Sequence, residues 1–255
     1  MRYALTVQYI GKNYSGSQIQ FENGEMIKKP TIQGELEKAI STLIFGDTEN
    51  KNRQVKTVFS GRTDAGVNSK GQVAHFNVDE TIVASKFLYH INEILPDDIS
   101  VCDLRLVDES FHAQKSAKKR YYRFEFVNRK CKNAFDGDLI RVKYPTDEQR
   151  MQKALSYLLG EHDFSSFKSS GTFNPSTVCS IEKIQVKKLD DRVFIDIVGN
   201  RFLYNMVRTI VGTLLEIEGH DLPPEHMKDV LEAKDRRKAG QTVSPYGLTL
   251  MKVEY

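Results

Sequence analysis

The order of strand-like and helix-like segments, β-α-β-β-α-β, occurs twice along the 255 residues of this chain. In the first half, Arg2 to Ile10 alternates as a strand does, and Thr31 is a suitable N-cap for a helix whose apolar residues follow at helical spacing. The other elements expected in this half are two strands, a helix and a last strand, at residues 55–59, 72–78, 85–95 and 99–107.

The second half repeats this order. Its first helix is expected to open at Thr146, because Gln149 completes a capping-box pattern, and to end at Gly160. Asp190 and Asp191 separate two strand-like runs and therefore predict a hairpin. The other expected elements are a first strand, the two hairpin strands, a long apolar helix and a last strand, at 121–127, 181–189, 192–198, 202–217 and 248–253.

This order is that of the ferredoxin-like arrangement, so the sequence predicts an α+β protein with two such halves. We expect an N-terminal domain over residues 1–108 and a C-terminal domain over residues 109–255. Function would then lie in the cleft between them.

Composition limits the class of protein. With 37 basic and 34 acidic residues the formal net charge is only +3, so affinity for an anionic partner has to come from local clusters. Cys102, Cys131 and Cys179 are widely spaced, which argues against a disulfide framework or a structural zinc site. No apolar run approaches the roughly 18 residues that span a bilayer. We therefore expect a cytoplasmic protein that does not contact membranes.

One carboxylate lies in a glycine-flanked connection between two strand-like runs, in the segment Ser60–Val67. Gly61 and Gly66 are expected to permit tight backbone geometry around Asp64. A loop residue presented by a rigid scaffold suits catalysis. A simple turn, in which Asp64 bonds its own backbone, would give the same spacing.

Residues 115–132 combine positive charge with aromatic rings. Eight basic residues against one acidic residue give this run a formal charge of +7. Such a mixture suits single-stranded or unstacked RNA, and Lys118, Lys119 and Arg120 are the basic residues expected to bind it. Alternation also fits a strand with one core face and one solvated face, with Tyr122 on the core face.

Arg208 occupies an otherwise apolar helix face, since Tyr204, Val211 and Leu215 share its stripe. A half-buried guanidinium requires an acceptor, and pairing with Asp64 would keep that carboxylate ionised. A structural ion pair, or a side chain that extends to solvent, explains Arg208 equally well.

Signatures of other catalytic classes are missing from the sequence. The six histidines form no His-x-x-x-His pair, and there is neither a phosphate-binding loop nor a Gly-x-Ser-x-Gly motif. We therefore expect no metal and no cofactor.

Taken together, these residues resemble the tRNA pseudouridine synthase A family nearly from end to end. The matching segments are Thr31–Glu37, Ser60–Val67, Phe111–Ala113, Gly160–Phe167, Asn205–Arg208, Ile210–Gly212 and Gly247–Leu248. The resemblance implies ferredoxin-like halves that form a continuous, mainly antiparallel sheet with helices on one face and a basic central cleft. It also implies a homodimer that binds tRNA and isomerises uridines 38 to 40 of the anticodon arm to pseudouridine.

The same resemblance implies roles for four residues. Asp64 matches the catalytic aspartate and Arg208 the arginine that pairs with it. Tyr122 matches the tyrosine that contacts the target base, and Arg62 the arginine next to the flipped nucleotide. The reaction breaks the bond from N1 to C1′ and rejoins uracil through C5, so it needs a carboxylate but no electron carrier.

Three positions depart from the family pattern. Ser17 stands where tryptophan is usual, Asn68 where histidine is common and Gln114 where arginine is common. These changes bear on RNA contacts more than on the reaction. A non-catalytic RNA-binding or tRNA chaperone protein, and a synthase that acts on another RNA, are the alternative interpretations of the sequence.

Overall fold

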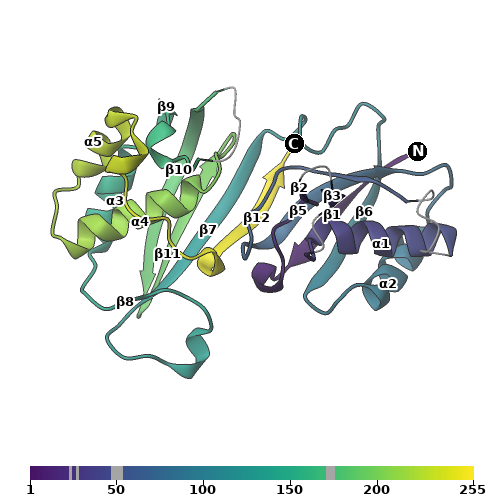
Figure 1. Cartoon of the computed structure of the whole chain (residues 1–255), viewed down its shortest axis with the longest axis horizontal. Helices are drawn as coiled ribbons and strands as arrows, with labels where there is room; N and C mark the ends of the chain where they lie inside the picture. Colours follow the sequence, from purple (N-terminus) through teal and green to yellow (C-terminus); the bar gives the residue numbers. More distant parts are fainter. Residues whose placement is uncertain (23–24, 27–28, 47–53, 171–175) are drawn as a thin grey trace. The chain divides into compact units, whose positions relative to one another are not determined.

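The computed structural model describes residues 1–22, 25–26, 29–46, 54–170 and 176–255, which form two compact units (Figure 1). Unit 1 comprises Met1–Lys118 and Leu250–Tyr255, and unit 2 comprises Lys119–Thr249. The described residues contain five α-helices and mostly antiparallel strands, so the expected combination of helices with a mainly antiparallel sheet is confirmed.

Unit 1 is built on strands β1 (Arg2–Tyr9), β4 (Thr57–Phe59), β5 (Asn68–Asn77) and β6 (Ile99–Val107). Strand β1 lies between β6 and β5 and is antiparallel to both, and β4 pairs antiparallel with β5. A short hairpin, β2 (Phe21–Glu22) and β3 (Glu25–Met26), precedes the first helix. All four strands predicted in this half are present.

Helices α1 (Ile32–Phe45) and α2 (Ala84–Ile94) pack on the alternate β1 side chains that face the core. The predicted N-cap of α1 is confirmed, because the Thr31 side chain accepts a hydrogen bond from the Gly34 N–H at 3.1 Å. Helix α2 begins one residue before the predicted Ser85, and Val83 at its start supplies no side-chain cap.

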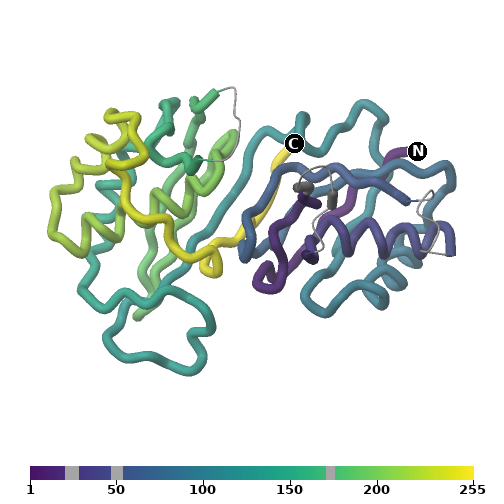
Figure 2. Tube along the Cα trace, in the orientation of Figure 1, coloured from purple at the N-terminus to yellow at the C-terminus, as the bar shows by residue number. Residues whose placement is uncertain are grey.

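The sheet of unit 2 has the order β7 (Lys119–Asn128), β11 (Arg192–Gly199), β10 (Val178–Leu189) and β9 (Gly160–Asp163). The predicted hairpin is confirmed: Leu189 pairs with Arg192 across a two-residue turn, in which Asp190 has a φ of 52°. After β7 the chain leaves the sheet in a long excursion and returns as β8 (Arg141–Val142), which pairs parallel to β7 (Figure 2).

Three helices cover the core of unit 2: α3 (Glu148–Ser156), α4 (Met206–Gly219) and α5 (His226–Ala233). Three predicted boundaries were wrong. Helix α3 ends at Ser156, and Gly160, the predicted end, instead begins β9. Asp147, not Thr146, caps α3, because the Thr146 hydroxyl instead bonds the Asn128 side chain at 2.8 Å. Helix α4 begins at Met206 rather than at residue 202, because Asn205 adopts the left-handed conformation with a φ of 61°.

Strand β9 and helix α5 were not predicted. Strand β9 has no alternating pattern, whereas α5 buries Met227, Val230 and Leu231 at helical spacing. The predicted last strand is present as β12 (Leu248–Glu254). Short 3₁₀ turns lie at Gly11–Asn13, Ala134–Asp136, Ser165–Phe167, Arg236–Lys238 and Pro245–Gly247.

Candidate active site

Asp64 lies on the loop that joins β4 to β5 in unit 1, where it is half-buried, while Arg62 is exposed. The Asp64 carbonyl accepts a hydrogen bond from the Val67 N–H at 3.1 Å, and Gly66 has a φ of 80°. Residues 64–67 therefore form a tight turn that requires glycine at its third position. The turn gives the Asp64 backbone a defined conformation beside an accessible surface.

Thr63, the residue before Asp64, forms hydrogen bonds through both its backbone and its side chain. The Thr63 N–H donates to the Ser17 Oγ at 2.8 Å, and the Ser17 N–H donates to the Thr63 carbonyl at 3.1 Å. The Tyr9 hydroxyl shares a hydrogen bond of 2.8 Å with the Thr63 Oγ1. Burial raises the pKa of Tyr9 to about 12, so this hydroxyl keeps its proton at neutral pH. The sequence did not reveal Ser17 and Tyr9 as partners of the loop, since both are far from it in the chain.

A second set of bonds holds the start of the loop. The Gln72 side chain, which is fully buried, donates from Nε2 to the Gly61 carbonyl at 3.0 Å. Its Oε1 accepts from the Ser60 hydroxyl at 2.5 Å. A buried amide with partners on both sides restrains the loop at the end of β4.

The glycines that the loop requires agree only in part with those predicted. Gly66 has the expected positive φ, but a Cβ at Gly61 would meet nothing within 4 Å, so tight geometry does not require Gly61. Instead, a Cβ at Gly11 would lie 2.1 Å from the Val67 carbonyl oxygen. Gly16 has a φ of 110°, and a Cβ added there would lie 3.0 Å from the Thr63 carbonyl oxygen. Both glycines precede the loop by about fifty residues, so their role is visible only in the fold.

Polar side chains of α1 connect this helix to the segments around the loop. The Gln33 side chain accepts from the Ile19 N–H at 3.1 Å and donates to the Thr57 carbonyl at 3.0 Å. Glu37 is buried and accepts from the Thr57 N–H at 2.8 Å. These residues belong to the segment Thr31–Glu37, and their bonds to β4 explain why polar groups occur on the buried side of α1.

Tyr122 lies on β7 in unit 2. Phe124 and Phe126 are fully buried on the same strand face, as the alternation predicted, whereas Tyr122 is only half-buried. Its ring meets that of Phe202 edge to face, with ring centroids 5.2 Å apart. This contact fixes the ring plane of Tyr122.

Arg208 projects from the first turn of α4 and is half-buried. Its Nε donates to the Val243 carbonyl at 2.8 Å, and its Nη1 donates to the Asn205 Oδ1 at 2.6 Å. Val211 and Leu215 are buried as predicted, but Tyr204 precedes the helix and is exposed, so the predicted stripe includes one residue too many. These two hydrogen bonds restrain the orientation of the guanidinium.

Three of the eight basic residues in 115–132 form ion pairs with acidic residues outside this segment. Arg123 forms a bidentate ion pair with Asp196, at 2.7 and 2.8 Å, above the ring of Phe194. Lys119 pairs with Glu182 at 2.8 Å. Arg129 pairs with Asp136 and Asp191. The charge of +7 counted along the sequence therefore overstates the local field.

The two remaining residues expected to bind RNA differ in their surroundings. Lys118 is exposed, and its backbone N–H donates to the Glu254 carbonyl at 2.7 Å. Arg120 is half-buried, and its Nη1 donates to the Asn200 carbonyl at 2.6 Å. Asp64 and Arg62 thus lie in unit 1 with Lys118, whereas Lys119, Arg120, Tyr122 and Arg208 lie in unit 2.

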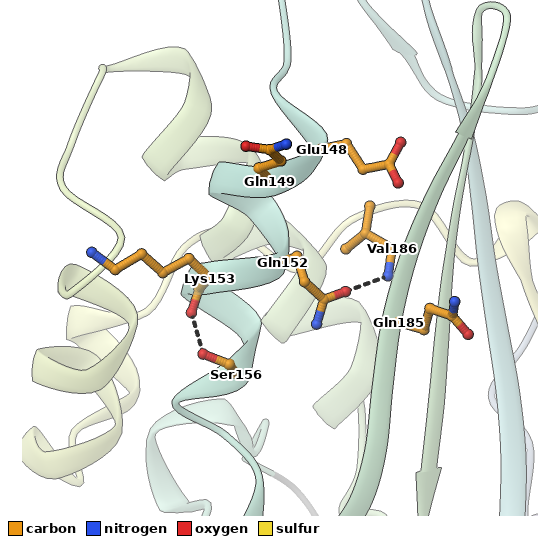
Figure 3. Close-up of a pocket in the computed structure, with 7 residues that line it drawn as sticks. All are labelled: Glu148, Gln149, Gln152, Lys153, Ser156, Gln185 and Val186. Carbon is orange, nitrogen blue, oxygen red and sulfur yellow. Dashed lines mark hydrogen bonds between the residues drawn. The ribbon is translucent and has the colours of Figure 1, made fainter.

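An open hollow of about 440 Å³ lies between α3 and β10 (Figure 3). Gln152 spans it, accepting from the Val186 N–H at 2.8 Å and donating to the Ile184 carbonyl at 3.2 Å. Glu148 accepts from the Lys188 N–H at 3.0 Å. These side chains form hydrogen bonds with backbone groups on the edge of β10, so the hollow is part of the packing of α3 against the sheet.

Within the described part of the chain, no group of three or more metal-ligating side chains occurs. Cys102, Cys131 and Cys179 form no disulfide, as predicted. No helix among the described residues is both long and apolar enough to cross a membrane.

Comparisons with known proteins relate the whole chain to enzymes that act on RNA. The family model described as tRNA pseudouridine synthase matches residues 154–255. The tRNA pseudouridine synthase A of Thermoanaerobacter sp. strain X514 is 40% identical, over 98% of each chain. That of Ehrlichia canis strain Jake is 39% identical over 100% of each chain, and that of Coxiella burnetii strain Dugway 5J108-111 is 40% identical over 100% of this chain and 93% of the relative.

The likeness to solved structures is distant. An archaeal box H/ACA sRNP Nop10–Cbf5 complex matches with a TM-score of 0.37 and 10% identity, over 92% of this chain and 59% of that chain. The sequence relationship therefore identifies the class: the chain is a pseudouridine synthase, an isomerase that converts uridine to pseudouridine. Within that class it belongs to the tRNA pseudouridine synthase A family, as its sequence motifs predicted.

Proposed function

We propose that this chain isomerises uridines 38 to 40 in the anticodon stem-loop of tRNA, with Asp64 as the catalytic carboxylate. The observation that carries this proposal is the turn at residues 64–67, which holds one half-buried carboxylate in a fixed backbone conformation. The relationship to tRNA pseudouridine synthases over the full chain supports the choice of reaction.

The reaction requires few chemical groups. The bond from N1 to C1′ breaks, the uracil turns, and a bond from C5 to C1′ forms. The hydrogen on C5 leaves as a proton and N1 gains a proton, so the product is an isomer of the substrate. Electrons are conserved, so Asp64 supplies the reactive group without a cofactor. Arg208 is the proposed partner of the Asp64 carboxylate, because a guanidinium keeps its charge and its planar fork suits a carboxylate.

The target uridine has to leave its base stack before it reacts, which costs a few kcal/mol. Tyr122 is proposed to contact the extruded base, and the edge-on ring of Phe202 supports the tyrosine in one orientation. Arg62 is exposed and is proposed to lie next to the flipped nucleotide, where its cation offsets part of the lost stacking.

Lys118, Lys119 and Arg120 are proposed to contact phosphates of the anticodon arm. Lys119 has to exchange its ion pair with Glu182 for a phosphate, so its net contribution is smaller than that of a lysine without an acidic neighbour. The active enzyme is proposed to be a cytoplasmic homodimer, by its resemblance to the family.

The two halves are proposed to be ferredoxin-like and to form one continuous sheet with a basic central cleft, divided into domains at residue 108. Two observations support the ferredoxin-like halves. In unit 1, β1 lies between β6 and β5, with β4 on β5. The order of elements along residues 119–255 includes the predicted one, to which β8, β9 and α5 are added.

The test uses tRNA transcripts that carry tritium at C5 of uridine. Because C5 loses its hydrogen only when the new carbon bond forms, release of tritium reports isomerisation. We expect release by the wild type and none by Asp64→Asn, which keeps the size of the side chain and still binds tRNA. Binding without release by the wild type would instead support a tRNA chaperone or a synthase for another RNA, and undiminished release by Asp64→Asn would refute the role of Asp64.

A further inference from the structure

Ser17 connects α1 to the loop that carries Asp64. It is only 1% exposed, and both its backbone and its side chain are bonded. Its Oγ accepts from the Thr63 N–H at 2.8 Å, and its N–H donates to the Thr63 carbonyl at 3.1 Å. Its carbonyl accepts from the Gln33 N–H at 2.9 Å, in the first turn of α1. Ser17 thus ties the loop to the start of a helix.

These bonds act on the backbone of Asp64. The Thr63 carbonyl belongs to the peptide group before the Asp64 Cα, and the Ser17 N–H holds it. The Asp64 carbonyl belongs to the following peptide group, and the Val67 N–H holds it at 3.1 Å. When both flanking peptide planes are held, φ and ψ of Asp64 are set, and with them the direction of the bond from Cα to Cβ.

The Ser17 hydroxyl completes this restraint. Thr63 is only 6% exposed. If the Ser17 Oγ were removed, the buried Thr63 N–H would lose the hydrogen bond that it donates to this atom. An unmet buried donor costs about 1–3 kcal/mol, and the loop can reduce that cost by turning the N–H toward solvent. Such a movement would rotate the peptide group between Arg62 and Thr63 and would shift Thr63, the residue next to Asp64.

We propose that Ser17 is a positioning residue for the isomerisation, acting through Thr63 on the direction in which the Asp64 carboxylate is presented. This inference rests on the role proposed for Asp64. Misplacement of a reacting group by about 1 Å costs up to a hundredfold in rate, because the reacting atoms no longer lie within reach of one another. Substrate binding depends on other surfaces, so the effect falls on turnover.

The test compares Ser17→Ala with a matched substitution, Ser41→Ala. Ser41 is 3% exposed, and its Oγ accepts from the Val55 N–H at 2.9 Å, the same kind of bond at the other end of α1. Three quantities are measured for each variant: the free energy of unfolding, the Kd for tRNA, and the single-turnover rate of tritium release at saturating enzyme.

We expect both variants to lose stability to a similar extent and to bind tRNA within about twofold of the wild type. Ser17→Ala is expected to release tritium at least tenfold more slowly than the wild type, and Ser41→Ala less than threefold more slowly. Equal rates for the two variants would overturn the proposal, because Ser17 would then act only on stability. If Ser17→Ala fails to fold, Ser17→Cys fills the site with a weaker acceptor and is judged by the same criteria.

Amide hydrogen exchange separates this inference from the proposed function. The Thr63 N–H is expected to exchange at least tenfold faster in Ser17→Ala than in the wild type, whether or not the protein is active. If exchange rises but the wild type releases no tritium from any tRNA, the proposed function fails and the positioning role fails with it. If the wild type is active and exchange does not rise, the positioning role alone is refuted.

Discussion

Acidification is expected to destabilise unit 1 through one buried histidine. His75 on β5 is 4% exposed, and its Nδ1 accepts from the Ala113 N–H at 3.2 Å, which requires an unprotonated nitrogen. Burial, and then the charges of Arg2 and His112, lower the pKa of His75 from its usual 6.5 to about 4. The unfolded chain therefore binds a proton between pH 6.5 and 4 that the folded chain does not bind.

The sign and size of the effect follow from that difference. Stability from the neutral ring is fully present above pH 6.5 and is lost as the pH falls toward 4. Since one pKa unit corresponds to about 1.4 kcal/mol, the free energy of unfolding decreases by at most about 2 kcal/mol between pH 7.5 and 5. Other titratable groups also make the free energy of unfolding depend on pH, so the contribution of His75 has to be measured against a variant that lacks it.

His75→Gln supplies that reference, because glutamine does not titrate and its Oε1 can accept from the same N–H. Urea unfolding at pH 7.5 and 5.0 measures both proteins. We expect the wild type to lose about 1–2 kcal/mol more than His75→Gln over this interval. Equal losses would refute the argument, since the folded protein would then protonate His75 as readily as the unfolded chain does.

Three further outcomes are expected. Gly11→Ala should lower the free energy of unfolding by about 1–3 kcal/mol and slow tritium release, because the added Cβ has no room beside the loop. Gly61→Ala should change the free energy of unfolding by less than about 0.5 kcal/mol, because its Cβ would meet nothing within 4 Å. Equal losses of stability for the two variants in urea unfolding would contradict this reasoning. Arg208→Lys should lower turnover at least tenfold with tRNA affinity nearly unchanged, because lysine lacks the planar fork, and wild-type turnover in steady-state kinetics would disprove it. Simultaneous substitution by alanine of Lys118, Lys119 and Arg120 should weaken tRNA binding and reduce the dependence of the affinity on salt concentration, both measured by filter binding. An unchanged salt dependence would exclude these three residues from the interface.

Local patterns in the sequence were enough to predict most of the fold. The strand at 99–107 and the N-cap at Thr31 were predicted correctly, because alternation and capping depend on neighbouring residues. Strand β9 is only four residues long and has no alternation, so pairing with β10 is what makes it a strand. The start of α4 depends on the conformation of Asn205, which the periodicity of the helix does not reveal.

The candidate site was predicted in part. The segment around Asp64 could be recognised from its residues, but its supports could not, since Tyr9, Ser17 and Gln72 reach the loop only through tertiary folding. The basic segment was recognised as well, but its acidic partners were not. Asp196 lies more than seventy residues from Arg123 in the chain, so a count of charges along the sequence overestimates the local positive charge.

The most direct test of the proposed function compares two tRNA transcripts labelled with tritium at C5 of every uridine. One transcript has uridine at positions 38 to 40, and the other has cytidine at all three positions. We predict release of tritium by the wild type from the first transcript alone, and none from either transcript by Asp64→Asn. Equal release from the two transcripts, or release by Asp64→Asn at the wild-type rate, would contradict the proposed function.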